Sequence, residues 1–319
     1  MLELALAEAA QYGEARSKSV IGKAMGKFPE LRASAKEVMS LIDEVVVEAN
    51  QMDPKDLEPF LPRKKEKPKE DVVKELPTLQ NSDKVVLRFA PGPSGPLHLG
   101  HTRALALNNY YRNRYAGKLI LRLEDTNPNA IDPEAYDMIQ SDMEWLGINS
   151  DEVVVQSDRM ETYYDDMRTI LSKGGAYVTN SEAEHWRDLK KRSEAHPDRN
   201  RDSDVQLNEF EALLSGGEGI VVIKTDLEDP NPALRDFVAF RVVESPHPRQ
   251  KDKYRLWPLY NYAVAIDDYR LGVTHVLRGK DHLNNTLKQK WIYKYMDWDE
   301  PEYIHYCLLY TSPSPRDRG

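Results

Sequence analysis

Residues 85–101 decide how this chain folds, and they read Val85-Val86-Leu87-Arg88-Phe89-Ala90-Pro91-Gly92-Pro93-Ser94-Gly95-Pro96-Leu97-His98-Leu99-Gly100-His101. A short apolar run typical of a strand passes into a turn rich in proline and glycine, and then into a helical pattern. Free backbone N–H groups and the helix dipole favour phosphate at such a helix start. The spacing matches neither a P-loop nor Gly-x-Gly-x-x-Gly, so we expect a different phosphate-binding device.

The bulk composition narrows the class of protein. The chain has 319 residues, of which 40% are hydrophobic and 30% charged, as in an ordinary globular protein with room for two or three domains. It contains no apolar run long enough to span a membrane, and its start does not resemble a signal peptide. The single cysteine, Cys307, excludes an intrachain disulfide and a cysteine-rich zinc site. We therefore expect a cytoplasmic protein with neither a membrane partner nor protein-bound zinc.

The charge of the chain limits how it could bind nucleic acid. The formal net charge is −9, which argues against non-specific binding through a global basic field. A local basic surface for one structured RNA stays open.

Two segments, residues 1–52 and 53–83, precede residues 85–101. Residues 1–52 are predicted to be helical, because apolar side chains recur at steps of three and four residues: Val38, Leu41, Ile42, Val45, Val46 and Ala49. We interpret them as a helical domain that packs on itself or on a protein partner. Residues 53–83 are rich in Pro, Lys and Glu and are predicted to form a charged, solvated linker. Interleaved acidic residues make an RNA-binding arm the weaker interpretation.

Strand and helix patterns alternate after residue 84, which predicts an α/β fold with a Rossmann-like, doubly wound parallel sheet. The predicted strands at 119–123 and 153–155 are separated by helices, the first at 104–115. From about 176 to 245 the pattern changes to that of an inserted α+β subdomain. Sheet character then returns at 272–279. Ligands bind beyond the carboxyl ends of strands in such sheets, where the Pro/Gly turn and Glu124 both fall.

His98 and His101 are the first candidate catalytic residues. Three residues apart, they project from one face of a helix start, where two imidazoles can stabilise charge on a phosphoryl group. Gly100 between them leaves bare backbone against which a flat base could lie. The alternatives are a helix-capping pair and a metal site, but no cysteine cluster or His-Glu-x-x-His motif supplies further metal ligands. The strand and turn before them favour the phosphate interpretation.

Charged residues in apolar strands form a second group of candidates. Arg88 precedes the turn and Glu124 ends the next strand, an arrangement suited to a zwitterionic small molecule. The alternative is a structural ion pair between the two strands. Arg278 could bind a carboxylate in bidentate fashion, or form a surface salt bridge with Asp281. Tyr260 follows Pro258 at an element boundary.

The chain resembles the glutamyl/glutaminyl subgroup of class I aminoacyl-tRNA synthetases over roughly residues 85–306. Residues 91–101 resemble the "HIGH" signature, and residues 121–128 its companion segment. Further motifs of that subgroup occur in the same order: Leu234-Arg235-Asp236, Pro246-His247-Pro248 with Lys253-Tyr254, Pro258-Leu259-Tyr260, and residues 272–281. His101 and the helical N-terminal extension resemble the archaeal/eukaryotic branch.

The resemblance implies that L-glutamate is ligated to tRNA(Glu) through a glutamyl adenylate. The substrate that drives the reaction would be ATP bound to Mg²⁺. It implies that His98, Gly100 and His101 bind ATP together with Gly92, Pro93, Ser94 and Gly279. Arg88, Glu124 and Tyr260 would position glutamate, and Arg278 would bind its side-chain carboxylate. The insertion would hold the acceptor end of the tRNA. A glutamine–tRNA ligase and a non-catalytic tRNA- or partner-binding module are the alternatives.

One departure from the family pattern concerns the end of the chain. The lysine-containing "KMSKS" loop is expected after Tyr306, where the sequence instead runs through Cys307 into a Ser/Pro/Arg tail. Residues 307–319 look non-native, and the C-terminal anticodon-binding barrels of this branch do not follow. The expected domains are therefore 1–52, the linker 53–83, the catalytic domain 84–306 and this tail. A chain of this kind is expected to be truncated and inactive.

Overall fold

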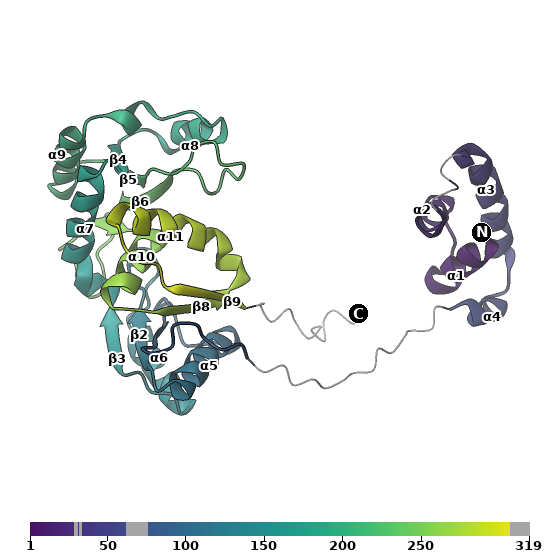
Figure 1. Cartoon of the computed structure of the whole chain (residues 1–319), viewed down its shortest axis with the longest axis horizontal. Helices are drawn as coiled ribbons and strands as arrows, with labels where there is room; N and C mark the ends of the chain where they lie inside the picture. Colours follow the sequence, from purple (N-terminus) through teal and green to yellow (C-terminus); the bar gives the residue numbers. More distant parts are fainter. Residues whose placement is uncertain (29–30, 32–33, 62–75, 307–319) are drawn as a thin grey trace. The chain divides into compact units, whose positions relative to one another are not determined.

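The computed structural model describes residues 1–28, 31, 34–61 and 76–306. The chain divides into two compact units, 1–77 and 78–319 (Figure 1). Much of the expected linker (62–75) and the whole expected tail (307–319) lie outside the described residues, as does the position of the expected lysine loop. No helix in the described ranges is both long and apolar enough to cross a bilayer.

The first unit is a small bundle of α1 (Leu2–Tyr12), α2 (Ser17–Lys27) and α3 (Ala35–Gln51), followed by α4 (Pro54–Leu57) and the short 3-10 turn η2 (Glu58–Phe60). Its core contains several alanines, which let the helices approach closely: Ala5, Ala9, Ala24 and Ala49. The helical prediction for this region is confirmed. Leu41 is an exception, because its side chain is 56% exposed although the pattern placed it on the buried face.

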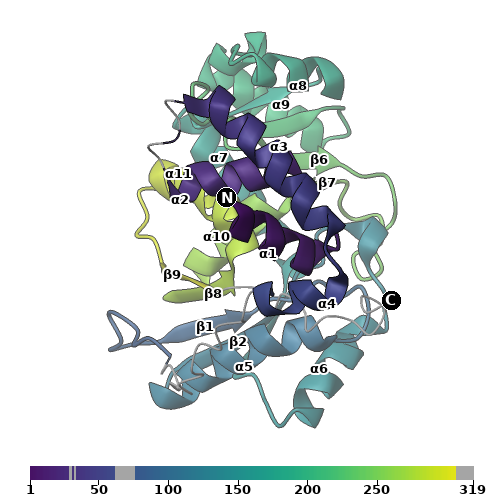
Figure 2. The same ribbon diagram turned by 90° about the vertical axis from the view of Figure 1, so that its right-hand side faces the viewer.

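The second unit is built on a parallel sheet. β1 (Val86–Phe89), β2 (Lys118–Leu123) and β3 (Glu152–Val155) form one ladder, and β8 (His275–Gly279) and β9 (Glu302–Tyr306) form another. The backbone N–H of Thr274 donates to Val86 O at 3.0 Å, which brings β8 alongside β1. The strands thus follow the order β3-β2-β1-β8-β9 (Figures 1 and 2). The predicted doubly wound sheet is confirmed, and its winding reverses between β1 and β8.

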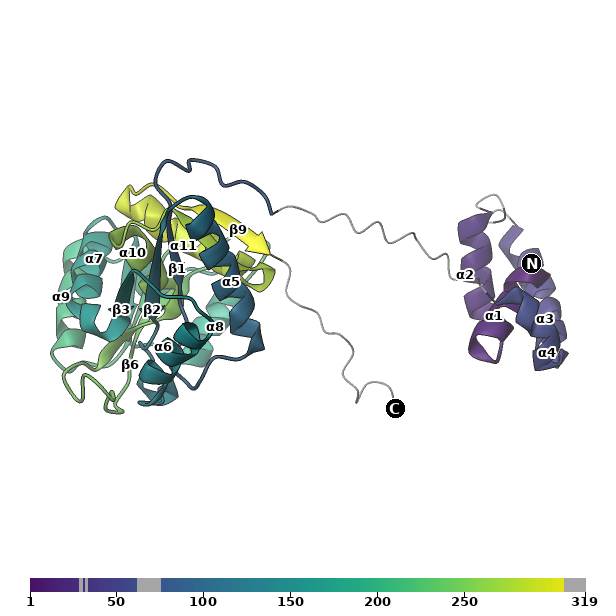
Figure 3. The ribbon, with the colours of Figure 1, turned by 90° about the horizontal axis from the view of Figure 1, so that it is seen from below.

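Alternate residues of the central strands face opposite sides of the sheet. Leu87, Phe89 and Leu121 pack beneath α5 (Leu99–Arg114) and α6 (Ala135–Trp145). Val86 and Ile120 belong to a separate cluster on the other face. Figure 3 shows α5 and α6 on the opposite side of β1 and β2 from α7 (Met160–Ser172). Arg88 and Arg122 share the parity of Val86 and Ile120, so they point away from α5.

A second, antiparallel sheet follows, formed by β4 (Ala176–Thr179), β5 (Ile220–Ile223), β6 (Phe237–Val242) and β7 (Leu256–Pro258). The helices α8 (Ala183–Lys191) and α9 (Ser203–Leu214) lie in the same region. The strands expected near 220–225 and 237–243 are present, whereas β4 was not predicted. Aromatic side chains fill the core between this sheet, α7 and α10 (Tyr260–Arg270): Tyr164, Phe210, Phe240, Trp257 and Tyr262.

The remaining elements complete the framework around the carboxyl ends of the parallel strands. α10 packs against α11 (Leu283–Met296), which follows β8. Short 3-10 turns occupy several connections: η3 (Pro128–Ala130), η4 (Gln156–Arg159), η5 (Pro197–Asn200) and η6 (Lys280–His282).

Candidate active site at the crossover of the sheet

A cavity of about 440 Å³ opens at the carboxyl ends of β1 and β8, where the winding of the sheet reverses. The structure brings nearly all of the sequence-predicted site residues to its walls: Arg88, Gly92, His98, Gly100, His101, Glu124, Tyr260, Arg278 and Gly279. Pro93 and Ser94 do not line it. The Pro93 carbonyl instead accepts a bond from the backbone of Asp132 at 2.9 Å, which ties the turn to the chain beyond it.

The two histidines begin α5 as a matched pair. His98 is the N-cap residue, and its Nδ1 accepts the backbone N–H of Gly100 at 3.0 Å. The Nδ1 of His101 accepts the N–H of His98 at 3.3 Å. Because both Nδ1 atoms act as acceptors, each neutral ring carries its proton on Nε2. The helix starts at Leu99, which confirms the predicted position of the two histidines at a helix start, and it begins five residues before the range 104–115 given for the helical pattern.

The surroundings of the two histidines favour the neutral form of the His101 ring. Burial lowers the pKa of His101, and the neighbouring His98 lowers it further. Gly100 is required by the same arrangement, since a Cβ there would lie 2.8 Å from Cε1 of His98. The capping interpretation is thus confirmed, and it leaves both Nε2–H groups available as donors. Within the described residues no group of His, Cys, Asp and Glu is arranged to hold a metal ion.

A network of charged side chains lies behind the wall of the cavity that Arg88 and Glu124 form. Oδ1 of Asp268, on α10, accepts from Nε of Arg88 at 3.1 Å and from Nη1 of Arg122 at 2.6 Å. Nη2 of Arg122 then donates to Oε1 of Glu124 at 2.9 Å. The direct Arg88–Glu124 ion pair considered from the sequence is not formed, because each residue has another partner.

Opposing effects set the ionisation of the two carboxylates. Burial alone would raise the pKa of Asp268, but Arg88 and Arg122 outweigh it and hold that pKa below its usual value. Burial raises the pKa of Glu124, and the pull of Arg122 and Arg88 only partly offsets this. Asp268 is therefore the more firmly ionised of the two.

Arg278 lies on the other half of the sheet with part of its guanidinium unpaired. It is 5% exposed, and Nη2 donates to Oγ1 of Thr286 at 2.5 Å. Nε and Nη1 are buried without a hydrogen-bond partner. Burial lowers the pKa of Arg278, and Arg88 lowers it further. The salt bridge with Asp281 considered from the sequence is not formed. A buried guanidinium with free N–H groups at a cavity wall is suited to an anion.

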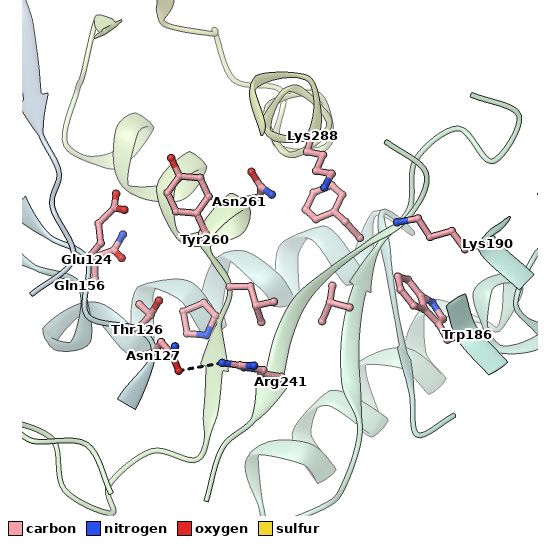
Figure 4. Close-up of a pocket in the computed structure, with 15 residues that line it drawn as sticks. Glu124, Thr126, Asn127, Gln156, Trp186, Lys190, Arg241, Tyr260, Asn261 and Lys288 are labelled. Atoms are coloured by element: carbon pink, nitrogen blue, oxygen red, sulfur yellow. Dashed lines mark hydrogen bonds between the residues drawn. The ribbon is translucent and has the colours of Figure 1, made fainter. Parts of the chain in front are cut away.

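A second cavity, of about 580 Å³, adjoins the first at Gly92, Glu124 and Tyr260 (Figure 4). Its far wall carries Trp186 and Lys190 of α8, and Lys288 of α11 points toward it. Burial and the nearby Lys288 lower the pKa of Lys190 to about 8. Gly92, Glu124 and Tyr260 thus line both cavities. On one side lies the first cavity with Arg278, and on the other lies the second cavity with Lys190 and Lys288.

Two residues of this charge network, Arg122 and Asp268, were not predicted as site residues from the sequence. Arg122 stands inside the apolar strand β2, and Asp268 follows the apolar run Val264–Ile266 in α10. A charge within a buried segment is a detectable signal for both. Their partnership, however, joins residues 146 positions apart in the chain.

Comparison with known proteins places these observations in a family. The model for "tRNA synthetases class I (E and Q), catalytic domain" matches residues 84–314. Glutamate–tRNA ligase of Methanocaldococcus jannaschii is 48% identical over 316 residues, which cover 97% of this chain and 57% of that protein. The glutamate–tRNA ligase of Methanopyrus kandleri is 46% identical, covering 96% and 55%. The chain therefore spans little more than half the length of these curated relatives.

A solved structure supports the same architecture. A glutamate–tRNA synthetase from Elizabethkingia anophelis superposes with a TM-score of 0.57 at 24% identity, covering 73% of this chain and 53% of the other. At that identity the likeness concerns the fold alone.

Proposed function

The chain belongs to the catalytic-domain family of class I glutamyl- and glutaminyl-tRNA synthetases, and from that membership we propose that the protein ligates L-glutamate to tRNA(Glu). In the first step a carboxylate oxygen of glutamate attacks the α-phosphorus of ATP, and pyrophosphate leaves. In the second step a ribose hydroxyl at the tRNA 3′ end attacks the activated carbonyl, and AMP leaves. The enzyme positions the reactants and stabilises charge without forming a covalent intermediate.

The net charge of the side chains beside the first cavity is the observation that favours glutamate over glutamine as the substrate. Arg278 and the charge network beside it comprise three guanidinium groups and two carboxylates, all buried except the half-buried Glu124: Arg88, Arg122, Arg278, Asp268 and Glu124. They carry one net positive charge, which L-glutamate, with one net negative charge, neutralises. Glutamine would leave Arg278 facing a neutral amide, with its charge uncompensated. Glu124 is assigned to the α-ammonium group and Arg278 to the side-chain carboxylate.

Arg88 and Tyr260 complete the amino-acid half of the cavity. Both line the cavity together with Glu124 and Arg278, and we assign them to the backbone carboxylate of the substrate. Oη of Tyr260 is 3.2 Å from Nδ1 of His282, which fixes the phenol at the border with the second cavity.

ATP is assigned to the half of the cavity formed by the start of α5. The Nε2–H groups of His98 and His101 are available to donate to phosphate oxygens, while Gly92, Gly100 and Gly279 present backbone there. Pro93 and Ser94 would shape the turn and not contact the nucleotide. Mg²⁺ would enter with ATP as part of the substrate, neutralising its phosphate charge.

The acceptor end of tRNA is assigned to the second cavity. Lys190, Lys288 and Arg241 supply positive charge for phosphates, and Tyr260 separates this cavity from the activated amino acid. The terminal ribose would therefore reach the adenylate past Glu124 and Tyr260. A cytoplasmic location and a protein partner for the N-terminal helices accompany this proposal as further predictions.

The test is a pair of measurements with glutamate and glutamine. Calorimetric titration of this chain is expected to detect glutamate binding and much weaker glutamine binding. The full-length protein is expected to charge tRNA(Glu) with labelled glutamate. A preference for glutamine would favour the glutamine–tRNA ligase, and RNA binding without any adenylate formation by the full-length protein would favour a non-catalytic module.

A further inference from the structure

Asp268 lies behind the amino-acid cavity without lining it. Its side chain is 1% exposed, on α10, and neither it nor Arg122 contributes to the cavity wall. Both residues nevertheless contact side chains that do line the wall. The connection runs from Arg88 through Asp268 and Arg122 to Glu124, and so joins the ends of β1 and β2.

The geometry of the connection fixes two functional groups at once. Asp268 engages Nε of Arg88, which leaves the terminal nitrogens of that guanidinium for a ligand. Arg122 uses separate nitrogens for Asp268 and Glu124, so its planar fork sets the distance between the two carboxylates. Loss of either central residue would leave a buried charge unpaired and free a wall residue to move.

We propose that Asp268 and Arg122 are positioning residues for the amino-acid substrate, holding Arg88 and Glu124 where they contact the amino acid. This rests on the proposed glutamate site. Neither residue contacts the substrate, and both act through the side chains that do. Because Asp268 lies on α10, the position of α10 against the sheet determines where Arg88 and Glu124 are held in the binding site.

The neighbouring residue provides a matched comparison. Asp267 is 0% exposed on the same helix and pairs with Arg159 at 2.7 Å. It also accepts from Gln156 and Tyr163. None of these partners lines the amino-acid cavity. Asp267→Asn therefore neutralises an equally buried carboxylate while leaving the Arg88–Glu124 connection intact.

A purely electrostatic role for Asp268 predicts the opposite result from a positioning role. Glutamate carries one net negative charge, so removing the negative charge of Asp268 would by itself tighten its binding. A positioning role predicts weaker binding. Arg122→Lys tests the same idea without changing the net charge, because an ammonium lacks the planar fork that holds both carboxylates.

The experiment measures the dissociation constants of L-glutamate and ATP, and the thermal unfolding midpoint, for the wild-type chain and the three variants. Asp268→Asn and Arg122→Lys are expected to weaken glutamate binding by about 10- to 100-fold, the scale of a lost charge-assisted contact. Their ATP affinity is expected to stay within about twofold. Asp267→Asn is expected to lower the unfolding midpoint comparably while keeping the glutamate affinity.

The measured affinities distinguish a failure of the proposed glutamate site from a failure of the positioning role of Asp268 and Arg122. A wild-type chain that binds no glutamate would overturn the proposed function and this inference together. A wild-type chain that binds glutamate, with Asp268→Asn binding it equally or more tightly, would overturn the inference alone. An equal loss in Asp267→Asn would also overturn it. If Asp268→Asn does not fold, Arg122→Lys decides by the same glutamate measurement.

Discussion

The imidazole rings of His98 and His101 stack with their centroids 3.8 Å apart and their planes 22° from parallel. Each Nδ1 atom accepts a backbone N–H, so the two Nε2–H groups form a pair of donors at the start of α5. Donors fixed in this way can stabilise charge that develops on a phosphate group.

Replacing the first histidine should separate capping from catalysis. His98→Ala is expected to lower the rate of glutamate-dependent ATP–pyrophosphate exchange by the full-length protein by about 100-fold, through loss of a transition-state donor. His98→Asn keeps a side chain that accepts the Gly100 N–H, so it should retain the cap and the stability but not the rate. Exchange at the wild-type rate in His98→Asn would contradict the catalytic assignment.

Arg278 should control the choice between glutamate and glutamine. Arg278→Gln removes the unpaired guanidinium, and the preference for glutamate over glutamine is expected to fall by about 100-fold. Competition between the two labelled amino acids in tRNA charging measures the change. Lys290→Gln is the control, because that lysine pairs with Glu300 away from the cavity. An unchanged preference in Arg278→Gln would show that another group reads the side chain.

RNA binding should weaken as the pH rises through the pKa of Lys190, about 8. The lysine is charged below this pH and neutral above it, so its attraction to phosphate is present at about pH 7 and lost at about pH 9. Filter binding of an acceptor-stem RNA at both values measures the loss. Lys190→Arg stays charged across this range and should abolish its share of the decline. An undiminished decline in that variant would exclude Lys190 as the source.

The interior strand β2 should tolerate little change on its buried face. Leu121 is fully buried, and Leu121→Ala is expected to lower the free energy of unfolding by about 2–5 kcal/mol through lost burial and a cavity. Val153 is its register partner on β3 and is 45% exposed, so Val153→Ala should cost less than about 1 kcal/mol. Urea unfolding followed by circular dichroism compares the two. Similar losses would mean that strand pairing, and not core packing, dominates at this position.

The parts of the site that could be predicted from the sequence are those that depend on residues close together in the chain. Arg88, Glu124 and Arg278 stand out because each interrupts or ends an apolar strand, and the turn between β1 and α5 is visible from its prolines and glycines. The parallel, doubly wound class of the sheet follows from the alternation of helices and strands.

The remaining errors have physical causes. The range 104–115 for α5 began too late, although the histidine pair was placed at a helix start, because Gly100 and Thr102 weaken the helical pattern and histidine is not among the usual N-cap residues. β4 is only four residues long, too short for a clear alternation. The Asp268–Arg122 pair depends on how α10 packs across the sheet, which no local pattern encodes.

The contact between β1 and β8 has a consequence for the mechanics of the enzyme. In the described part of the chain, Thr274 links the two strands through its backbone N–H to Val86 O and through its Oγ1, which accepts the Val86 N–H. Thr274 thus links the two halves of the parallel sheet, β3-β2-β1 and β8-β9, where β1 lies beside β8. The cavity lies at the carboxyl ends of these two strands. Under the proposed function, a glutamate molecule bound to Glu124 on one half and to Arg278 on the other would link the two halves across this line, and it would do so only while it is bound.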